Sequence, residues 1–255
     1  MNESTFPEFS SFERERYERQ VRLPGFGFQA QRQLKQAKVL ISRVGGVGGT
    51  VSMRLAQAGI GHLVLAHGGR IVPEYLNRWP LALPSDLGRP CIEVFLERLE
   101  AMNADMKLTG EPANVNEENV AALVDQVDLI VDAAPLFEER YLLNQQAVHQ
   151  RKPLIMAAMY GTEGYITTIV PGETPCLACL YPKKPDYWNS IQAFPVIGPC
   201  SDLVGAIAAM EAIKVLTNFG TPLKGVLWFF DLQNNIMRHL QIQRRPDCPV
   251  CGESA

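Results

Sequence analysis

The stretch Lys38-Val-Leu-Ile-Ser-Arg-Val-Gly-Gly-Val-Gly-Gly49 decides the fold of this 255-residue chain. An apolar run ends at a glycine cluster, residues 50–59 continue with a helical pattern, and residues 62–66 form a second apolar run. This order predicts a strand–turn–helix–strand unit. Such a turn presents backbone N–H groups and the positive end of a helix dipole, which suits a phosphate-bearing ligand. A glycine turn that only packs tightly is the alternative.

The rest of the chain repeats the alternation of strands and helices. Further strands are expected at residues 127–132, 153–157 and 164–170, with helices at 91–102, 138–149 and 203–216 and a late hairpin-like pair at 226–230 and 239–243. Strand–helix alternation implies a parallel sheet. We therefore predict an α/β fold of the Rossmann-like, doubly wound type, with a mostly parallel sheet extended by late antiparallel strands.

Composition narrows the class of protein. With 47% hydrophobic and 20% charged residues and a net charge of −3, the chain has the make-up of a globular protein, and the mild acidity argues against nucleic acid as the main partner. No apolar run approaches the length of a membrane span, and residues 1–19 lack an apolar signal core. We expect a cytoplasmic protein with no membrane partner.

Two CxxC pairs predict a metal site. Cys176 and Cys179 form the first pair, and Cys248 and Cys251 form the second. Four thiolates at this spacing describe a closed tetrahedral zinc site with a structural role, which would staple the C-terminal tail to the main body. Two separate redox or free-thiol pairs are the alternative.

Several motifs together resemble the ThiF/MoeB/HesA family, the bacterial relatives of ubiquitin-activating enzymes. They are Arg16-Tyr-Glu-Arg-Gln20, the Gly45-Gly-Val-Gly48 turn, Gly161-Thr-Glu-Gly164, Gly198-Pro199 before a helix, and the paired CxxC motifs. The resemblance covers nearly the whole chain. It implies a single domain over residues 1–255, with a nucleotide-binding half at about 1–160 and a partner-binding and zinc half at about 161–255.

The resemblance also implies a homodimer and a reaction. In the family, ATP adenylates a carboxylate, often the C-terminal glycine of a ubiquitin-like or sulfur-carrier protein, and pyrophosphate leaves. Arg78 matches an arginine near the triphosphate, and Arg19 matches one donated by the other protomer. Gly45, Gly46 and Gly48 form the phosphate turn.

At other positions the chain departs from the family pattern. Arg43 replaces the first glycine, so its side chain would either reach the phosphates or occupy their space. His67 stands at the position of the ribose-binding acid. Asparagine, lysine and a magnesium-binding aspartate are replaced by Tyr75, Cys91 and Pro135. Asp132 lies a few residues before Pro135 and could be a substitute ligand.

The family's reactive cysteine corresponds to Ile191 here. Cys200 is the nearby thiol, although a lone cysteine beside a packed helix is usually a small buried hydrophobic residue. Residues 181–193 correspond to the crossover loop, where lysines and aromatic residues either grip a partner tail or form an ordinary loop.

Two hypotheses follow from this mixture. The first is an active adenylate-forming enzyme with a remodelled site, in which Arg43 and Arg78 provide the positive charge and the substrate is a carrier tail or a small carboxylic acid. The second is a non-catalytic binding or scaffold protein that keeps the dimer and the zinc but no longer uses ATP and magnesium. We favour the first. A nicotinamide- or flavin-dependent oxidoreductase is less favoured because no acidic residue follows the second strand to hold a ribose.

Overall fold

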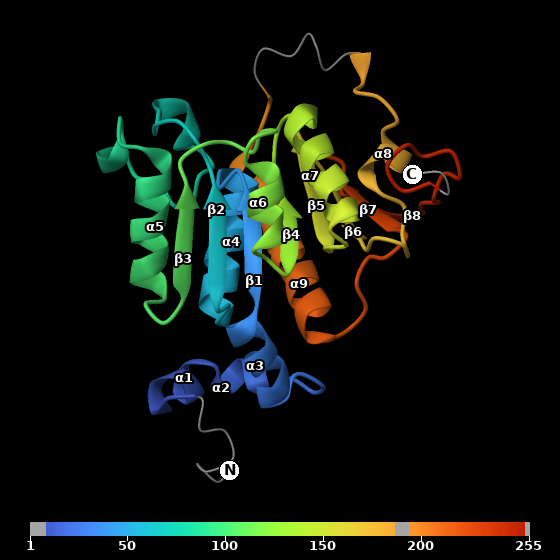
Figure 1. Cartoon of the computed structure of the whole chain (residues 1–255). Helices are drawn as coiled ribbons and strands as arrows, with labels where there is room; N and C mark the ends of the chain where they lie inside the picture. Colours follow the sequence, from blue (N-terminus) through green and yellow to red (C-terminus); the bar gives the residue numbers. More distant parts are fainter. Residues whose placement is uncertain (1–8, 187–193, 253–255) are drawn as a thin grey trace.

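The computed structural model describes residues 9–186 and 194–252. These residues form an eight-stranded sheet in the order β3-β2-β1-β4-β5-β6-β7-β8 (Figure 1). The strands are β1 Lys38–Ser42, β2 His62–Ala66, β3 Lys107–Glu111, β4 Leu129–Asp132, β5 Leu154–Tyr160, β6 Glu163–Ile169, β7 Val226–Asp231 and β8 Ile236–Gln241. Neighbours from β3 to β5 pair in parallel, and those from β5 to β8 pair antiparallel. The predicted fold class is confirmed.

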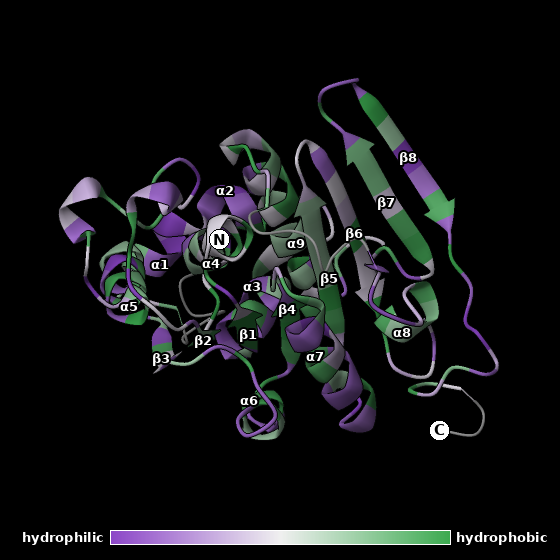
Figure 2. Cartoon of the chain, turned by 90° about the horizontal axis from the view of Figure 1, so that it is seen from above, coloured by the Kyte–Doolittle hydropathy of each residue, from purple (hydrophilic) through white to green (hydrophobic). Residues whose placement is uncertain are grey.

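Helices cover both faces of this sheet (Figure 2). One face carries α3 Gly27–Gln36, α4 Gly46–Ala58, α5 Cys91–Met102 and α9 Gly198–Thr217, and the other carries α6 Val120–Asp125, α7 Phe137–His149 and α8 Leu177–Leu180. Helices α4 and α9 approach closely because α9 offers Gly205, where an added Cβ would lie 2.6 Å from the Cβ of Thr50. The few charges of α9 reflect this buried position.

The N-terminal helices pack far from the glycine turn. They are α1 Ser11–Arg16, which begins with a capping box at Ser10, and α2 Glu18–Val21. Gln20 donates a 2.9 Å hydrogen bond to the carbonyl of Ala58 at the C-terminal end of α4. A helix of 13 residues is about 20 Å long, so α2 lies roughly that far from the turn at which α4 begins (Figure 1).

Two single-turn 3-10 helices, Pro73–Tyr75 and Pro84–Asp86, lie between β2 and α5. In the part of the chain that the structure describes, every helix is too short or too polar to cross a membrane.

Candidate functional site

The strand order reverses between β1 and β4, which is where doubly wound sheets form a ligand crevice outside the carboxyl ends of the strands. A cavity of about 880 Å³ opens at this point. Its wall includes the glycine turn, the segments that follow β2 and β4, and the last residues of β5. The cavity therefore connects the predicted phosphate turn to the antiparallel half of the sheet.

The glycine turn has the close packing that the sequence predicts. Gly45 and Gly46 line the cavity, whereas Gly48 is buried beneath it. An added Cβ at Gly48 would lie 2.3 Å from the carbonyl oxygen of Arg43, so only glycine fits there. Helix α4 begins at Gly46 with no side-chain cap. Its first N–H groups are therefore suited to an anionic ligand.

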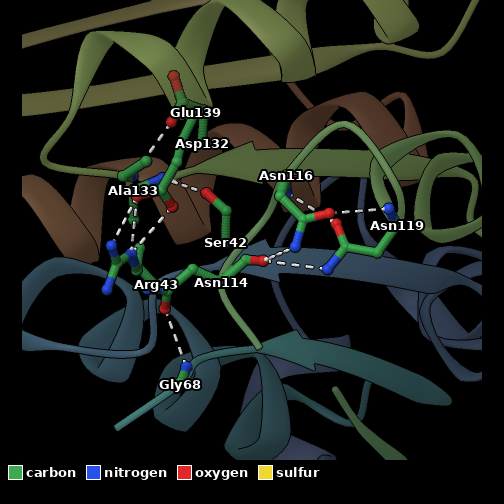
Figure 3. Close-up of polar contacts among 10 residues, drawn as sticks. Ser42, Arg43, Gly68, Asn114, Asn116, Asn119, Asp132, Ala133 and Glu139 are labelled. Carbon is green, nitrogen blue, oxygen red and sulfur yellow. Dashed lines mark hydrogen bonds and ion pairs between the residues drawn. The ribbon is translucent and has the colours of Figure 1, made fainter. Parts of the chain in front are cut away.

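Arg43 enters the turn in the left-handed region, with φ 60°, where a glycine would be less strained. Its guanidinium lines the cavity and is held by Glu139 on α7 (Figure 3). Nε donates to the two carboxylate oxygens at 3.1 and 2.9 Å, and Nη2 donates to Oε1 at 2.6 Å. The Arg43 side chain is thus at the cavity wall and already paired.

Asp132 does not lie on the cavity wall. Its side chain is 1% exposed and accepts hydrogen bonds from Arg140 Nη1 at 3.0 Å and from the Ala134 N–H at 3.1 Å. Burial raises the pKa of the Asp132 carboxyl, and Arg140 opposes that rise. Both carboxylate oxygens already accept hydrogen bonds, so the Asp132 side chain is not available in the cavity as a substitute magnesium ligand.

Magnesium, which the family resemblance implies, does not fit the expected position. Pro135 lines the cavity there and has no side-chain oxygen. Among the described residues on the wall, the carboxylates are Glu74 and Glu163, which follow β2 and begin β6. The carboxyl end of β4 therefore offers no free carboxylate for a cation.

Arg78 also lines the cavity. Its Nη1 donates to the carbonyl of Glu74 at 2.7 Å and to Oδ1 of Asn77 at 2.9 Å, and burial lowers the pKa of Arg78. The guanidinium lies 5.8 Å from the ring centre of Tyr75, which in turn stacks on Trp79 with centroids 3.7 Å apart. Arg78 is therefore placed beside an aromatic wall of the cavity.

His67 follows β2 and lines the cavity but cannot replace an acid. Its ring packs edge-on against Trp79 and Phe95, with centroids 5.0 and 5.2 Å away, and its buried Nδ1 has no hydrogen-bond partner among the described residues. Burial, with a smaller contribution from Arg43, lowers the pKa of His67 to about 3. The imidazole is neutral at physiological pH.

This neutral histidine predicts an acid-sensitive fold. In the unfolded chain a histidine has a pKa near 6.5 and binds a proton below that pH. In the folded protein His67 does not bind this proton until about pH 3. The free energy of unfolding should therefore fall with decreasing pH, with a contribution of up to about 1.4 kcal/mol per pH unit. Urea unfolding between pH 6.5 and 4 should show a shallower dependence in His67→Leu than in wild type. Replacement of the exposed His149 by glutamine is the control. If the free energy of unfolding depends equally on pH in all three proteins, His67 is not the source of the acid sensitivity.

Cys91, at the family's lysine position, is buried and does not line the cavity. Burial raises the pKa of its thiol to about 11. A neutral thiol at this depth supplies no positive charge to a phosphate.

The far end of the cavity is mainly apolar and aromatic. Its wall is formed by residues 156–160 of β5, Tyr165 of β6, Tyr181 and Phe194. The described part of the crossover loop reaches Asp186, and Lys184 forms a 2.7 Å ion pair with Glu138 on α7. Ile191 lies outside the described residues.

Cys200 lies at the start of α9 with no exposed surface. Its Sγ is 3.6 Å from the Glu163 carbonyl, and burial together with Asp231 and Glu163 raises its pKa to about 11. A thiolate is the reactive form of cysteine. Cys200 is therefore a packed, protonated thiol in this conformation.

The four CxxC cysteines meet as predicted. Their sulfur atoms all lie within 4.8 Å of one another, with Cys176 Sγ 3.7 Å from Cys248 Sγ and Cys179 Sγ 3.4 Å from Cys251 Sγ. A tetrahedral zinc–thiolate site with bonds of about 2.3 Å has edges of about 3.8 Å. The arrangement fits a structural metal site that joins α8 to the C-terminal segment.

Two contributors to the site were not predicted from the sequence. Glu139 and Arg140 lie in the first turn of α7, and each pairs with a residue at the carboxyl end of a strand. Their signal in the sequence is the charged Glu138-Glu139-Arg140 run beside the edge of the sheet where a ligand is predicted.

Arg19, which the sequence predicts for the site together with Arg43 and Arg78, is not at the cavity of its own chain. It is exposed on α2, at the other end of the sheet (Figure 1).

Comparisons with known proteins show the family and the fold of this chain. A sequence profile of the ThiF family matches residues 17–250. The chain is 42% identical to the heterocyst protein HesA of Trichormus variabilis, covering 95% of this chain and 90% of that protein. It is 36% identical to the sulfur carrier protein adenylyltransferase of Thermus thermophilus, with 94% and 92% covered. The E. coli MccB structure with ATP superposes with a TM-score of 0.82 and 26% identity, covering 93% of this chain and 74% of that one.

Proposed function

We propose that this chain, which belongs to the ThiF family, transfers the adenylyl group of ATP to a carboxylate at the end of a protein or peptide tail. The observation that carries the proposal is the cavity of about 880 Å³, which joins the glycine turn to the apolar wall of β5 and β6. Helix N–H groups and guanidinium groups at one end suit phosphates. Apolar and aromatic side chains at the other end suit an extended tail.

The chemistry needs few specialised groups. A tail carboxylate is already ionised at neutral pH, so its oxygen can attack the α-phosphorus of ATP without a general base. A carboxylate–phosphorus bond forms, the bond between the α-phosphorus and the bridging oxygen breaks, and pyrophosphate leaves with the electron pair. Negative charge grows on the leaving oxygens. Arg43 and Arg78 on the cavity wall are the cations assigned to that charge.

The substrate class follows from the relatives and from the cavity. One relative is named as a sulfur carrier protein adenylyltransferase, and a solved structure holds MccB of E. coli together with MccA. We infer that the substrate is the tail of a ubiquitin-like or sulfur-carrier protein. A small carboxylic acid is the alternative substrate, which the experiment must exclude. The chain has six cysteines, all buried; four of them meet in the four-cysteine cluster, and the other two are Cys91 and Cys200. The proposed product is therefore the acyl adenylate itself rather than a thioester.

Label transfer tests this function. The chain is incubated with ATP labelled at the α-phosphate and a carrier protein that ends in glycine, or the same carrier with its C-terminal carboxylate amidated. The expected result is label only on the carrier with the free carboxylate, released as labelled AMP when hydroxylamine converts the acyl adenylate to a hydroxamate. Label on neither protein, or on both, would refute adenylation of the tail.

We further propose that zinc occupies the four-cysteine cluster and that the protein works in the cytoplasm, where reducing conditions keep these thiols available to metal. The nucleotide half at about 1–160 and the partner half at about 161–255 would act as one domain. In support, residues from both halves line the cavity.

A homodimer completes the proposed site. In support, α2, which carries Arg19, lies about one length of α4, roughly 20 Å, from the glycine turn of its own chain, so we expect Arg19 to serve the site of a partner copy. We expect Arg19→Ala and Arg78→Ala to be inactive alone. Mixed heterodimers should recover activity, because the Arg19→Ala protomer has an intact cavity and receives Arg19 from its partner. No recovery in purified heterodimers, or a monomeric mass at micromolar concentration, would contradict this arrangement.

A second candidate function is favoured by one observation. The Arg43 guanidinium is paired with Glu139 at the turn, so the chain in this state is electrostatically satisfied without a nucleotide. A non-catalytic protein that binds a tail or serves as a scaffold would keep such a pair permanently. The response of Arg43 variants, argued in the Discussion, separates the two functions.

A further inference from the structure

We propose that Glu139 is an internal competitor of the nucleotide: it holds the Arg43 guanidinium at the phosphate turn, and a polyphosphate must take its place for ATP to bind. The proposal rests on the proposed function and adds a residue that regulates access to the same site.

The geometry of the pair supports an exchange of partners. Three hydrogen bonds of 2.6 to 3.1 Å join the guanidinium to the carboxylate. Carboxylate and phosphate both present pairs of oxygens that match the fork of an arginine, so one can replace the other on Arg43. Glu139 thus occupies the donors that a phosphate would use.

The placement of the two side chains makes Arg43 the accessible member. The side chain of Arg43 is 20% exposed and lines the cavity, whereas that of Glu139 is 7% exposed and does not. A ligand entering the cavity therefore meets the cation before it meets the carboxylate. The pair can open by movement of the arginine toward the ligand, while Glu139 stays in place.

The surrounding charges explain why this arginine matters. Arg140, the next residue of α7, also lines the cavity, but its Nη1 is committed to the buried Asp132 and its Nη2 to the Ala157 carbonyl at 3.1 Å. The carboxyl end of β4 offers no free carboxylate for magnesium. Arg43 is thus the cation at the turn that a polyphosphate can recruit by displacing one carboxylate.

The exchange of partners costs free energy, and removing this cost should tighten nucleotide binding. When Arg43 turns to a phosphate, Glu139 is left as a buried carboxylate without that partner. Replacing Glu139 by glutamine removes the buried charge and weakens the competing pair. Nucleotide binding should therefore tighten.

Calorimetry with ATP in buffer free of magnesium, with no chelator so that the four-cysteine cluster keeps its metal, provides the experiment. We expect Glu139→Gln to bind ATP at least about tenfold more tightly than wild type, the size expected for one charge-assisted contact. Glu138→Gln, its exposed neighbour on the same helix, is the matched control and should bind as wild type does. In an Arg43→Ala background the gain from Glu139→Gln should vanish, because the effect acts through the arginine.

A gain that persists without Arg43 would show simple charge repulsion and would overturn the proposal. So would an unchanged affinity in Glu139→Gln. If wild type forms the tail adenylate while Glu139→Gln binds no more tightly, this inference fails and the proposed function stands. If neither protein binds ATP, both fail.

A measurement on wild-type protein covers the case of a Glu139 variant that does not fold. The Nε resonance of Arg43 in protein labelled with ¹⁵N-arginine, assigned with Arg43→Lys, should shift when ATP is added. A resonance that does not move at saturating ATP would overturn the exchange.

Discussion

Removal of metal from the four-cysteine cluster should release the C-terminal segment and lower the free energy of unfolding by at least about 3 kcal/mol. The cluster joins two segments about 70 residues apart, since Cys176 is the N-cap of α8, Cys179 lies within α8, and Cys248 and Cys251 lie near residue 250. All four side chains are buried, and without a metal their sulfurs would face one another with no cation between them. In a chain of this size, that loss corresponds to a fall in Tm of roughly 6–12 °C.

Metal analysis and thermal unfolding check this prediction. Protein purified without chelator should contain about one zinc per chain. The double variant Cys248→Ser/Cys251→Ser should lose zinc and become sensitive to protease near its C-terminus. Cys91→Ala, which removes a buried thiol outside the cluster, should keep the metal. Zinc-free wild-type protein with an unchanged Tm would contradict a structural metal.

Arg43→Ala should weaken ATP binding by about 1.5 to 3 kcal/mol, which is the value of a charge-assisted contact. Arg43 is the cation on the cavity wall at the glycine turn, and its backbone conformation, with φ 60°, holds the side chain at that point. The opposite result belongs to the non-catalytic alternative. If the side chain only blocks the phosphates, Arg43→Gly should create or strengthen nucleotide binding, and Pro135→Asp should add to it by restoring a carboxylate.

Replacing Arg43 therefore changes the affinity for ATP in opposite directions under the two functions: the affinity falls in Arg43→Ala if the protein is an enzyme, and it rises in Arg43→Gly if Arg43 blocks the site. Titration of ATP into both variants by calorimetry measures them. Unfolding in urea is the control, because glycine also relieves the left-handed backbone and should stabilise the turn slightly. Nucleotide binding by Arg43→Gly together with none by wild type would overturn the enzyme in favour of a binding protein.

Features governed by local sequence were predictable. The glycine turn, the parallel strands β1, β2, β4 and β5 and the four-cysteine cluster follow from short-range patterns of apolar residues, glycines and cysteines. Strand β3 was not predicted because Lys-Leu-Thr-Gly-Glu at 107–111 has no apolar run and is only half buried at the edge of the parallel strands. Strand β8 was placed three residues late, because its exposed residues give no clear alternation.

The site depended on contacts between distant residues. Arg43 and Glu139 are 96 positions apart, and their pairing is set by how α7 docks beside β1 and β4. Asp132 appeared as a substitute metal ligand because its partner, Arg140, becomes its neighbour only when α7 folds back on the strand. The neutral state of His67 follows from burial between Trp79 and Phe95, which sequence spacing does not reveal.

Exchange of label between pyrophosphate and ATP tests the central claim most directly, because it reports reversible attack of a carboxylate on the α-phosphorus and needs no stable product. Wild-type protein with a glycine-ended carrier should incorporate labelled pyrophosphate into ATP, and the rate should fall to background in Arg78→Ala and with the amidated carrier. Exchange at background level with wild-type protein and the free carrier, or exchange that is indifferent to the tail carboxylate, would contradict an adenylyltransferase that activates such a tail.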